Sequence, residues 1–240
     1  MNIAEKLMFI AENERKIYNK GSSDKDSQFW DSIQDYGNRT DYIYAFARWG
    51  GEYIRPKYKV SPSTTVHHMF FACRSLKRVE SEYFDFSKVP LNYSASTQGV
   101  STMFNGCSNL EQIDDVGLIG GYYYQTFANC MKLHTIKKIT VDENTKFTDA
   151  FTRCDALANI TIEGVIGQTI EFKHSPLSID SLKNIILCLK DYDGTTNENK
   201  YTLTITSDCN TRLLNEGNTA PGGVNWINYA LGKKWGLITV

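Results

Sequence analysis

One short pattern occurs four times in this chain and constrains its fold more than any other feature. Each copy begins with an aromatic residue or valine, followed by Phe four residues later, Cys three after that, Leu three further on, and Ile or Val after three more. The copies are Val66, Phe70, Cys73, Leu76, Val79; Val100, Phe104, Cys107, Leu110, Ile113; Tyr123, Phe127, Cys130, Leu133, Ile136; and Phe147, Phe151, Cys154, Leu157, Ile160. Successive cysteines are 34, 23 and 24 residues apart. Periods of about 20 to 50 residues are typical of solenoids, whose units bury their apolar sides against their neighbours.

Each copy predicts one helical turn followed by a short strand. Phe and Cys are three residues apart and would share one face of the turn. The Leu-x-x-Ile part continues into ITV at 139–141 and ITI at 160–162, which alternate as strands do. Stacked units would then align Phe over Phe and Cys over Cys. Because a thiol is small and among the most buried side chains, the sequence predicts a ladder of structural cysteines.

The array is expected to cover residues 63–177 and to end in a degenerate unit. Ile170 follows Phe147 by the same interval of 23 residues, and His174 and Leu177 then replace Phe and Cys. Terminal units of solenoids are usually atypical because one of their sides faces water.

The residues before the array, 1–62, predict an N-terminal helical segment. Apolar residues at helical spacing indicate a helix over 2–19, a second one around 29–36, and a third helical stretch over 41–49. Residues 52–62 alternate between apolar and polar, with prolines as breaks, and are expected to be extended.

Residues 178–240 predict a small α/β cap. A helix is expected from Ser178 to about residue 192, a strand over 201–206, a helix ended by Gly232, and a C-terminal strand over 236–240 that pairs with the first strand. The fold class is therefore α/β (α+β), with a repeat array between the helical segment and the cap.

Composition and charge exclude several function classes. The chain has 240 residues, 41% of them hydrophobic, and a formal net charge of -1. Nucleic-acid binding is not expected, since it needs a basic face. Charged residues interrupt the first apolar stretch, so we expect no signal peptide, and no window is long enough to span a membrane. A protein made in a reducing cytosol would keep its six cysteines as thiols.

Catalytic and metal sites are not predicted. None of the six cysteines has another within four residues, whereas zinc cysteines come in close pairs. The paired acidic residues, Asp114 with Asp115 and Asp191 with Asp193, fit turns better than an acid and base pair. His67, His68 and His174 carry no partner motif. We expect no enzyme activity and no cofactor.

Tyr122 and Tyr124 are the predicted binding residues. They flank Tyr123, which occupies the leading position of the third copy and should lie in the core. Exposed tyrosines give large, rigid contact area with a polar tip, which suits protein surfaces and sugar rings. The alternative is that both rings only continue the stack, since aromatic residues also fill β-faces.

The repeats resemble those of a known family. The M-F-x-x-C-x-x-L-x-x-[IV] copies at Met69 and Met103, with their relatives at Phe127 and Phe151, are similar to the leucine-rich repeats of BspA-type bacterial surface proteins. The stretches EKLMFIAENERKIYNKG, FWDSIQDYGNRTDYIYAFARWG, SPLSIDSLKNIILCLKDY and GKKWGLITV also resemble leucine-rich-repeat proteins encoded with tail and baseplate genes of Firmicutes phages and prophages. This similarity covers nearly the whole chain.

The resemblance implies a non-enzymatic tail or baseplate component, located in the virion and present there in many copies as a homo-oligomer. The helical segment over 1–62 is then expected to dock the protein on the particle. Its expected partners are other tail or baseplate proteins and a glycan or protein of the host surface. The insert around residues 81–97, which lengthens the first interval, is expected to be a loop specialised for contact. A bacterial cell-surface adhesin of the BspA type is the alternative, and the expected absence of a signal peptide favours the virion.

Overall fold

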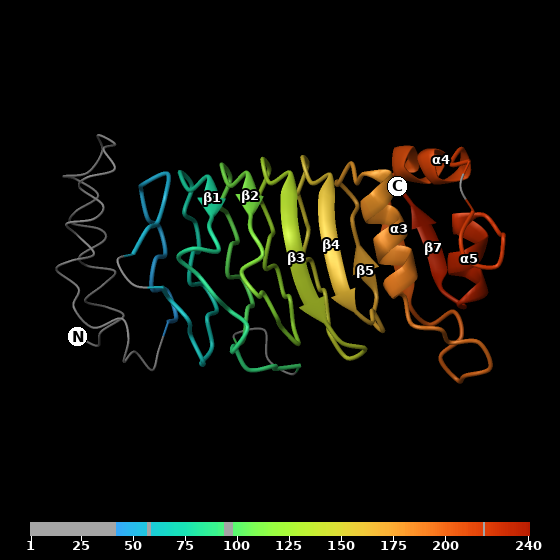
Figure 1. Ribbon diagram of the computed structural model, residues 1–240, viewed down its shortest axis with the longest axis horizontal. Coiled ribbons are helices and arrows are strands. Elements are labelled where there is room, and N and C mark those ends of the chain that lie inside the picture. Colours follow the sequence, from blue (N-terminus) through green and yellow to red (C-terminus); the bar gives the residue numbers. More distant parts are fainter. Residues whose placement is uncertain (1–41, 57–58, 94–97, 218) are drawn as a thin grey trace.

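Two parallel sheets and three helices form the part of the chain that the computed structural model describes, residues 42–56, 59–93, 98–217 and 219–240. Successive segments lie side by side along the long axis of an elongated molecule (Figure 1). The chain thus has a mixed α/β fold with parallel sheets. The helices expected over 2–19 and around 29–36 lie outside the described residues.

The first sheet joins the four sequence copies. Its strands are β1 (Arg78–Val79), β2 (Gln112–Ile113), β3 (Thr135–Val141) and β4 (Asn159–Gly164), hydrogen-bonded in that order and parallel. Val79 is opposite Ile113, Ile113 opposite Ile136, and Ile136 opposite Ile160. The last position of each copy therefore forms a buried ladder, as the sequence predicts.

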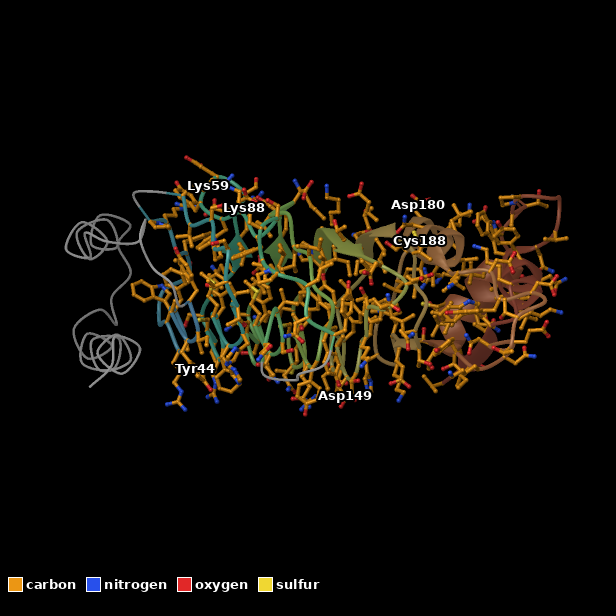
Figure 2. The ribbon with its side chains drawn as sticks, turned by 90° about the horizontal axis from the view of Figure 1, so that it is seen from below. Tyr44, Lys59, Lys88, Asp149, Asp180 and Cys188 are labelled. Atoms are coloured by element: carbon orange, nitrogen blue, oxygen red, sulfur yellow. The ribbon has the colours of Figure 1, made fainter. Side chains whose placement is uncertain are left out.

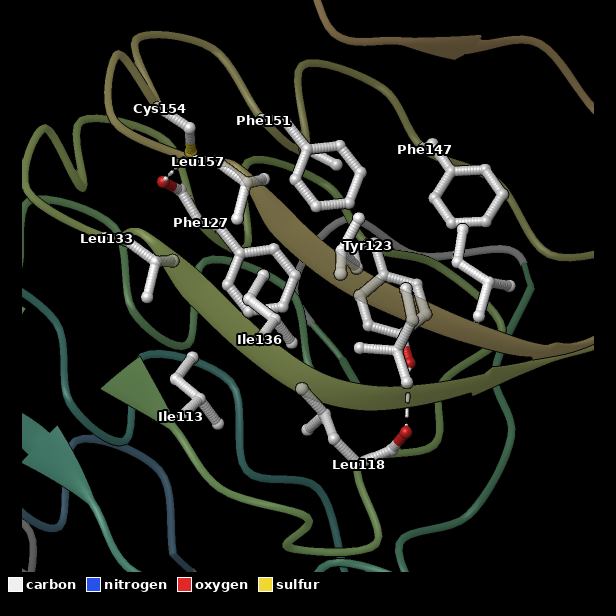
Figure 3. Close-up of a cluster of buried hydrophobic side chains, with 14 of the residues drawn as sticks. Ile113, Leu118, Tyr123, Phe127, Leu133, Ile136, Phe147, Phe151, Cys154 and Leu157 are labelled. Carbon is white, nitrogen blue, oxygen red and sulfur yellow. Dashed lines mark hydrogen bonds between the residues drawn. The ribbon is translucent and has the colours of Figure 1, made fainter. Parts of the chain in front are cut away.

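The phenylalanines form a second ladder. The ring centroids of Phe70 and Phe104 are 5.1 Å apart, those of Phe104 and Phe127 5.8 Å, and those of Phe127 and Phe151 5.4 Å. Their planes lie within 11° of parallel. Figure 3 shows Phe127 beside Phe151, and Tyr123 beside Phe147, within this core. Stacked aromatic rings bury large apolar area, so this ladder packs neighbouring units against each other.

The prediction of a helical turn at Phe and Cys is wrong. Each unit instead makes two consecutive β-turns, and the third residue of each turn has a positive φ, as in a type II turn. These left-handed residues are, by unit, His68 and Ala72; Thr102 and Gly106; Gln125 and Asn129; Asp149 and Arg153.

Hydrogen bonding explains why turns replace the helix. Within the second unit, the N–H of Cys107 donates to the carbonyl of Phe104 at 3.0 Å. The N–H groups of Phe104 and Gly106 instead donate to Thr126 and Ala128 of the next unit, both at 2.9 Å. Alternate backbone donors thus serve the turn and the neighbouring unit, which a helix could not do because its donors bond within it.

Residues 42–49 form an additional unit, so the helix predicted over 41–49 is wrong. Tyr44 and Arg48 have φ values of 56° and 61°, at the same positions as in the other units. The ring of Phe46 stacks on that of Phe70 at 5.4 Å. Trp49 takes the position that cysteine has elsewhere. The i, i+4, i+7 spacing is shared by a helix and by this double turn, which explains the error.

The degenerate unit lies two residues from its predicted register. Phe172, and not His174, stacks on Phe151 at 4.6 Å. Ser175, and not Leu177, takes the cysteine position, because it follows Phe172 by three residues and its N–H closes the turn on the carbonyl of Phe172 at 3.2 Å. Its Oγ donates to the carbonyl of Cys154 at 3.2 Å. The stacked phenylalanines of the last two units, Phe151 and Phe172, are fewer than 23 residues apart. A constant period of 23 residues therefore predicts the wrong residues for this unit.

The insert over 81–97 is only partly a surface loop. Phe84 and Phe86 are buried, Phe84 pairs with Val60, and the N–H of Phe86 donates to Val116 at 2.7 Å. Its first half therefore belongs to the core, contrary to the expectation of a loop specialised for contact. Leu91, further along, is exposed.

The second sheet lies at the C-terminal end. It consists of β5 (Ile170–Glu171), β6 (Thr202–Ile205) and β7 (Gly236–Thr239), which are parallel and in that order. The predicted pairing of the last two strands is confirmed. Helices α3 (Ile179–Cys188), α4 (Ser207–Leu214) and α5 (Trp226–Gly232) complete this region. Helix α4 was not expected from the sequence.

Helix α3 covers the open edge of the first sheet. The Oγ of Ser181 accepts the N–H of Ile160 at 2.9 Å. The side chain of Asn184 accepts the N–H of Ile162 at 2.7 Å and donates to its carbonyl at 3.1 Å. These side chains stand in for the next strand, so the edge of β4 is not open to pairing with another chain.

Candidate binding surface

The cysteine ladder has a structural geometry. The thiols of Cys73, Cys107, Cys130 and Cys154 donate to the carbonyls of Phe46, Phe70, Phe104 and Phe127 in the preceding unit, at 2.9, 3.0, 3.1 and 3.1 Å. The last of these contacts is drawn in Figure 3. Burial raises the pKa of all four thiols. They therefore stay protonated, whereas a nucleophile or a metal ligand needs the thiolate. Across the described ranges no three His, Cys, Asp or Glu side chains gather as a metal would require.

The histidine pair is part of an aromatic cluster near the N-terminal end. The ring of His68 stacks on that of Tyr44 at 4.6 Å and meets Phe71 edge to face at 5.2 Å. Desolvation, followed by the nearby charge of His67, lowers the pKa of His68 to about 4. His68 is thus neutral at pH 7 and packs against its neighbours.

The acidic pairs form an ion pair and a turn. Asp114 accepts three hydrogen bonds from the Arg78 guanidinium, at 2.8, 2.9 and 3.2 Å, and one from Gln112 at 2.6 Å. Burial acts to raise the pKa of Asp114, but these hydrogen bonds and the positive charges outweigh it and lower the pKa. The carboxylate of Asp191 accepts the N–H of Asp193 in a turn at 3.0 Å.

Ion pairs continue along the exposed side of β1 to β4, which we call the strand face. Lys138 lies 2.9 Å from Asp115 and 3.5 Å from Glu163. Lys137 lies 3.8 Å from Asp114. Charges on this face are therefore matched with one another across neighbouring strands.

We call the outer side of the double turns the turn face. In Figure 2, Tyr44 and Asp149, both at turn positions, lie along one long side of the molecule, while Lys59 and Lys88 lie along the opposite side. Because the backbone of every turn is bonded to its neighbours, side chains on this face have fixed spacing.

Tyr122 and Tyr124 lie together at this face. Both are half-buried and their ring centroids are 5.9 Å apart, with the planes at 61°. Tyr123, between them, is fully buried, and its hydroxyl donates to the carbonyl of Leu118 at 3.3 Å. The prediction that Tyr123 belongs to the core and its neighbours point elsewhere is confirmed. The hydroxyl of Tyr122 donates to Thr148 at 3.1 Å.

A pocket adjoins the tyrosines through Thr148. Its volume is about 360 Å³. The lining residues come from the fourth unit, from the start of the degenerate unit and from the residue before β6: Lys146, Phe147, Thr148, Asp149, Gln168, Thr169, Glu171 and Tyr201. This pocket was not expected from the sequence, because these segments meet only once the units stack.

The far wall of the pocket is held firmly. The ring centroid of Tyr201 lies 5.3 Å from that of Tyr192, and its hydroxyl accepts a hydrogen bond from Gln168 at 3.4 Å. The Oγ1 of Thr169 accepts the N–H of Thr202 at 3.2 Å. Tyr192 in turn donates to the carbonyl of Gly167 at 2.7 Å.

No protein-family model, curated protein or solved structure matches this chain. Among the helices of the described part, none has both the length and the apolar character to cross a membrane.

Proposed function

We propose that the chain is a leucine-rich-repeat solenoid of the BspA-like kind, and that it is a non-enzymatic component of a phage or prophage tail or baseplate. The resemblance of the repeats and of both ends of the chain supports this proposal. Regular units joined by parallel backbone hydrogen bonds fit a solenoid, and solenoids present extended surfaces for binding. The virion is its proposed location.

One observation carries the binding role. Tyr122 and Tyr124 form an aromatic pair on a face whose backbone is fixed by inter-unit hydrogen bonds, and Thr148 and Asp149 of the next unit extend that surface. Rigid aromatic contact area loses little entropy on binding. The proposed partners are neighbouring tail or baseplate proteins and a glycan or protein of the host surface.

The location is tested by mass spectrometry of purified particles from the strain that encodes the chain. We expect the protein in many copies per particle. Its absence from particles, together with its presence on the surface of the producing cell, would support the adhesin alternative instead.

The binding role is tested by the variant Tyr122→Ala/Tyr124→Ala. We expect assembled particles that adsorb to host cells at least about tenfold more slowly, since aromatic anchors commonly dominate an interface. Tyr53→Ala is the matched control. The ring of Tyr53 packs against the guanidinium of Arg55, which lies 4.4 Å from the ring centroid, and does not belong to this pair. Unchanged adsorption of the double variant would remove these tyrosines from the binding surface.

A further inference from the structure

We infer that the pocket lined by Lys146, Asp149, Gln168, Glu171 and Tyr201 binds a neutral oligosaccharide. This inference rests on the proposed function, since a host-surface glycan is among its proposed partners, and it adds the site and the chemical class of the ligand. The chemistry of the lining side chains, their charge and their rigidity each support it.

The lining offers the mixture of donors and acceptors that sugar hydroxyls require. Asp149 and Glu171 supply carboxylate acceptors, Lys146 supplies a donor, and Thr148 supplies a hydroxyl that can do both. A sugar hydroxyl is itself a donor and an acceptor, so it can bond a carboxylate and an ammonium at once. The pocket volume of about 360 Å³ lies within the range of about 300 to 1,000 Å³ typical of small-ligand sites.

Aromatic rings stand on both sides of the polar groups. Tyr201 forms part of the lining, and Tyr122 reaches the opposite rim through its hydrogen bond to Thr148 at 3.1 Å. Flat aromatic faces bind the C–H side of a sugar ring, while the hydroxyls at its edge need polar partners. A chain of several sugars could therefore extend from Tyr201 toward Tyr122 and Tyr124.

The charge of the pocket favours a neutral ligand over a polyanion. Lys146 is the basic residue of the lining, and two carboxylates stand with it. Glu171 also has an ion pair with Lys173 at 3.0 Å. A sulfated or phosphate-rich polymer would meet Asp149 and Glu171 as like charges, since binding such a polymer needs clustered basic residues.

The site is built before any ligand arrives. Asp149 is in the left-handed conformation, with a φ of 52°, and its turn is bonded to the preceding unit through the N–H of Gln125, which donates to Thr148 at 2.9 Å. Gln168 and Tyr192 hold the ring of Tyr201. Ordering these groups beforehand reduces the entropic cost of binding.

The experiment uses the purified full chain and an array of neutral oligosaccharides of hexose and N-acetylhexosamine units, followed by titration calorimetry with the best of them. Dextran sulfate serves as the polyanionic probe. We expect binding to at least one neutral oligosaccharide and none to dextran sulfate. Asp149→Asn should weaken binding about tenfold, because it removes a charge-assisted hydrogen bond while Asn tolerates the left-handed backbone.

Three further variants serve as controls and comparisons. Asp155→Asn changes an exposed carboxylate of the same unit outside the pocket and should bind as the wild type does. Tyr201→Phe keeps the ring and the fold, and its affinity for the oligosaccharide should fall only a few-fold. Tyr201→Ala should abolish binding. Thermal unfolding of Tyr201→Ala checks that this variant is folded.

Three results would overturn the inference: no neutral oligosaccharide bound at millimolar concentration, equal losses in Asp149→Asn and Asp155→Asn, or dextran sulfate competing for the same site. Its failure is separable from that of the proposed function. Particles that contain the protein and need Tyr122 and Tyr124 for adsorption, but bind no neutral glycan, would reject the pocket alone. Glycan binding by a protein absent from particles would reject the tail role alone.

Discussion

The strand face and the turn face of the same units differ in how their side chains are used. On the strand face, charges from adjacent strands are paired with each other, as Arg78 is with Asp114 and Lys138 with Glu163. On the turn face, tyrosine rings, hydroxyls, one lysine and two carboxylates surround a pocket. Both faces have backbones fixed by hydrogen bonds between units, so rigidity does not distinguish them. Their side-chain chemistry indicates that the turn face is the better candidate for binding.

The largest effect should come from the core that both faces share. Phe104→Ala removes the ring that stacks on Phe70 at 5.1 Å and on Phe127 at 5.8 Å. We expect the free energy of unfolding to fall by about 3 to 5 kcal/mol, because the cavity would lie between units that cannot collapse. Urea unfolding measures this loss.

Tyr124→Ala, on the turn face, is the control for the core variant. It should cost about 1 kcal/mol or less, because Tyr124 is only half-buried. Equal losses in the two variants would show that the turn-face tyrosine is itself a core residue, and the comparison between faces would fail.

The strand face should respond next, through Asp114. Asp114→Asn weakens the paired hydrogen bonds from Arg78, and we expect a loss of about 1 to 2 kcal/mol at pH 7, since Arg78 is partly exposed. Folding lowers the pKa of Asp114 below its ordinary value of 3.8. Its contribution is therefore complete above that value and is lost as the pH falls through the lower pKa of the folded state.

Acid unfolding curves of the two proteins test this contribution. The wild type should lose more stability than Asp114→Asn as the pH falls below about 4, because only the wild type has the carboxylate to protonate. Parallel curves would mean that the strand-face ion pairs do not stabilise the fold.

The smallest effect concerns the cysteine ladder. Cys107→Ser keeps a donor to the carbonyl of Phe70, just as the hydroxyl of Ser175 donates to the carbonyl of Cys154. The free energy of unfolding should fall by about 1 kcal/mol or less. Cys107→Val loses the donor and adds volume, and should cost about 1 to 3 kcal/mol. Chemical unfolding of both variants makes the comparison. A more stable valine variant would show that the thiol only fills space.

The sequence predicted the stacking and missed the turns for a physical reason. Apolar residues at a constant period reveal which side chains are buried, and Phe104, Phe127 and Ile136 lie in the core as expected. The backbone conformation is not visible in that pattern. Glycine would have indicated left-handed turn positions, but His68 and Thr102 occupy two of them, because inter-unit hydrogen bonds hold the turns whatever the residue.

The candidate site was predicted only in part. Tyr122 and Tyr124 could be placed outside the core because Tyr123 has the repeated position. The pocket could not be predicted, since it unites the fourth unit with Gln168 and Tyr201, and the residues that lead to β6 lie more than 50 positions after Lys146. These residues are close together because β5 pairs with β6 in a defined register. A pairing between segments far apart in the sequence cannot be inferred from a local residue pattern.

Hydroxyl-radical footprinting of the protein bound to host cells, compared with the free protein, shows directly which of the two faces makes the contact. We expect protection of Tyr122, Tyr124 and Tyr201 on the turn face and unchanged reactivity of Lys137 and Lys138 on the strand face. Protection of the two lysines, with the three tyrosines as reactive as in the free protein, would contradict it.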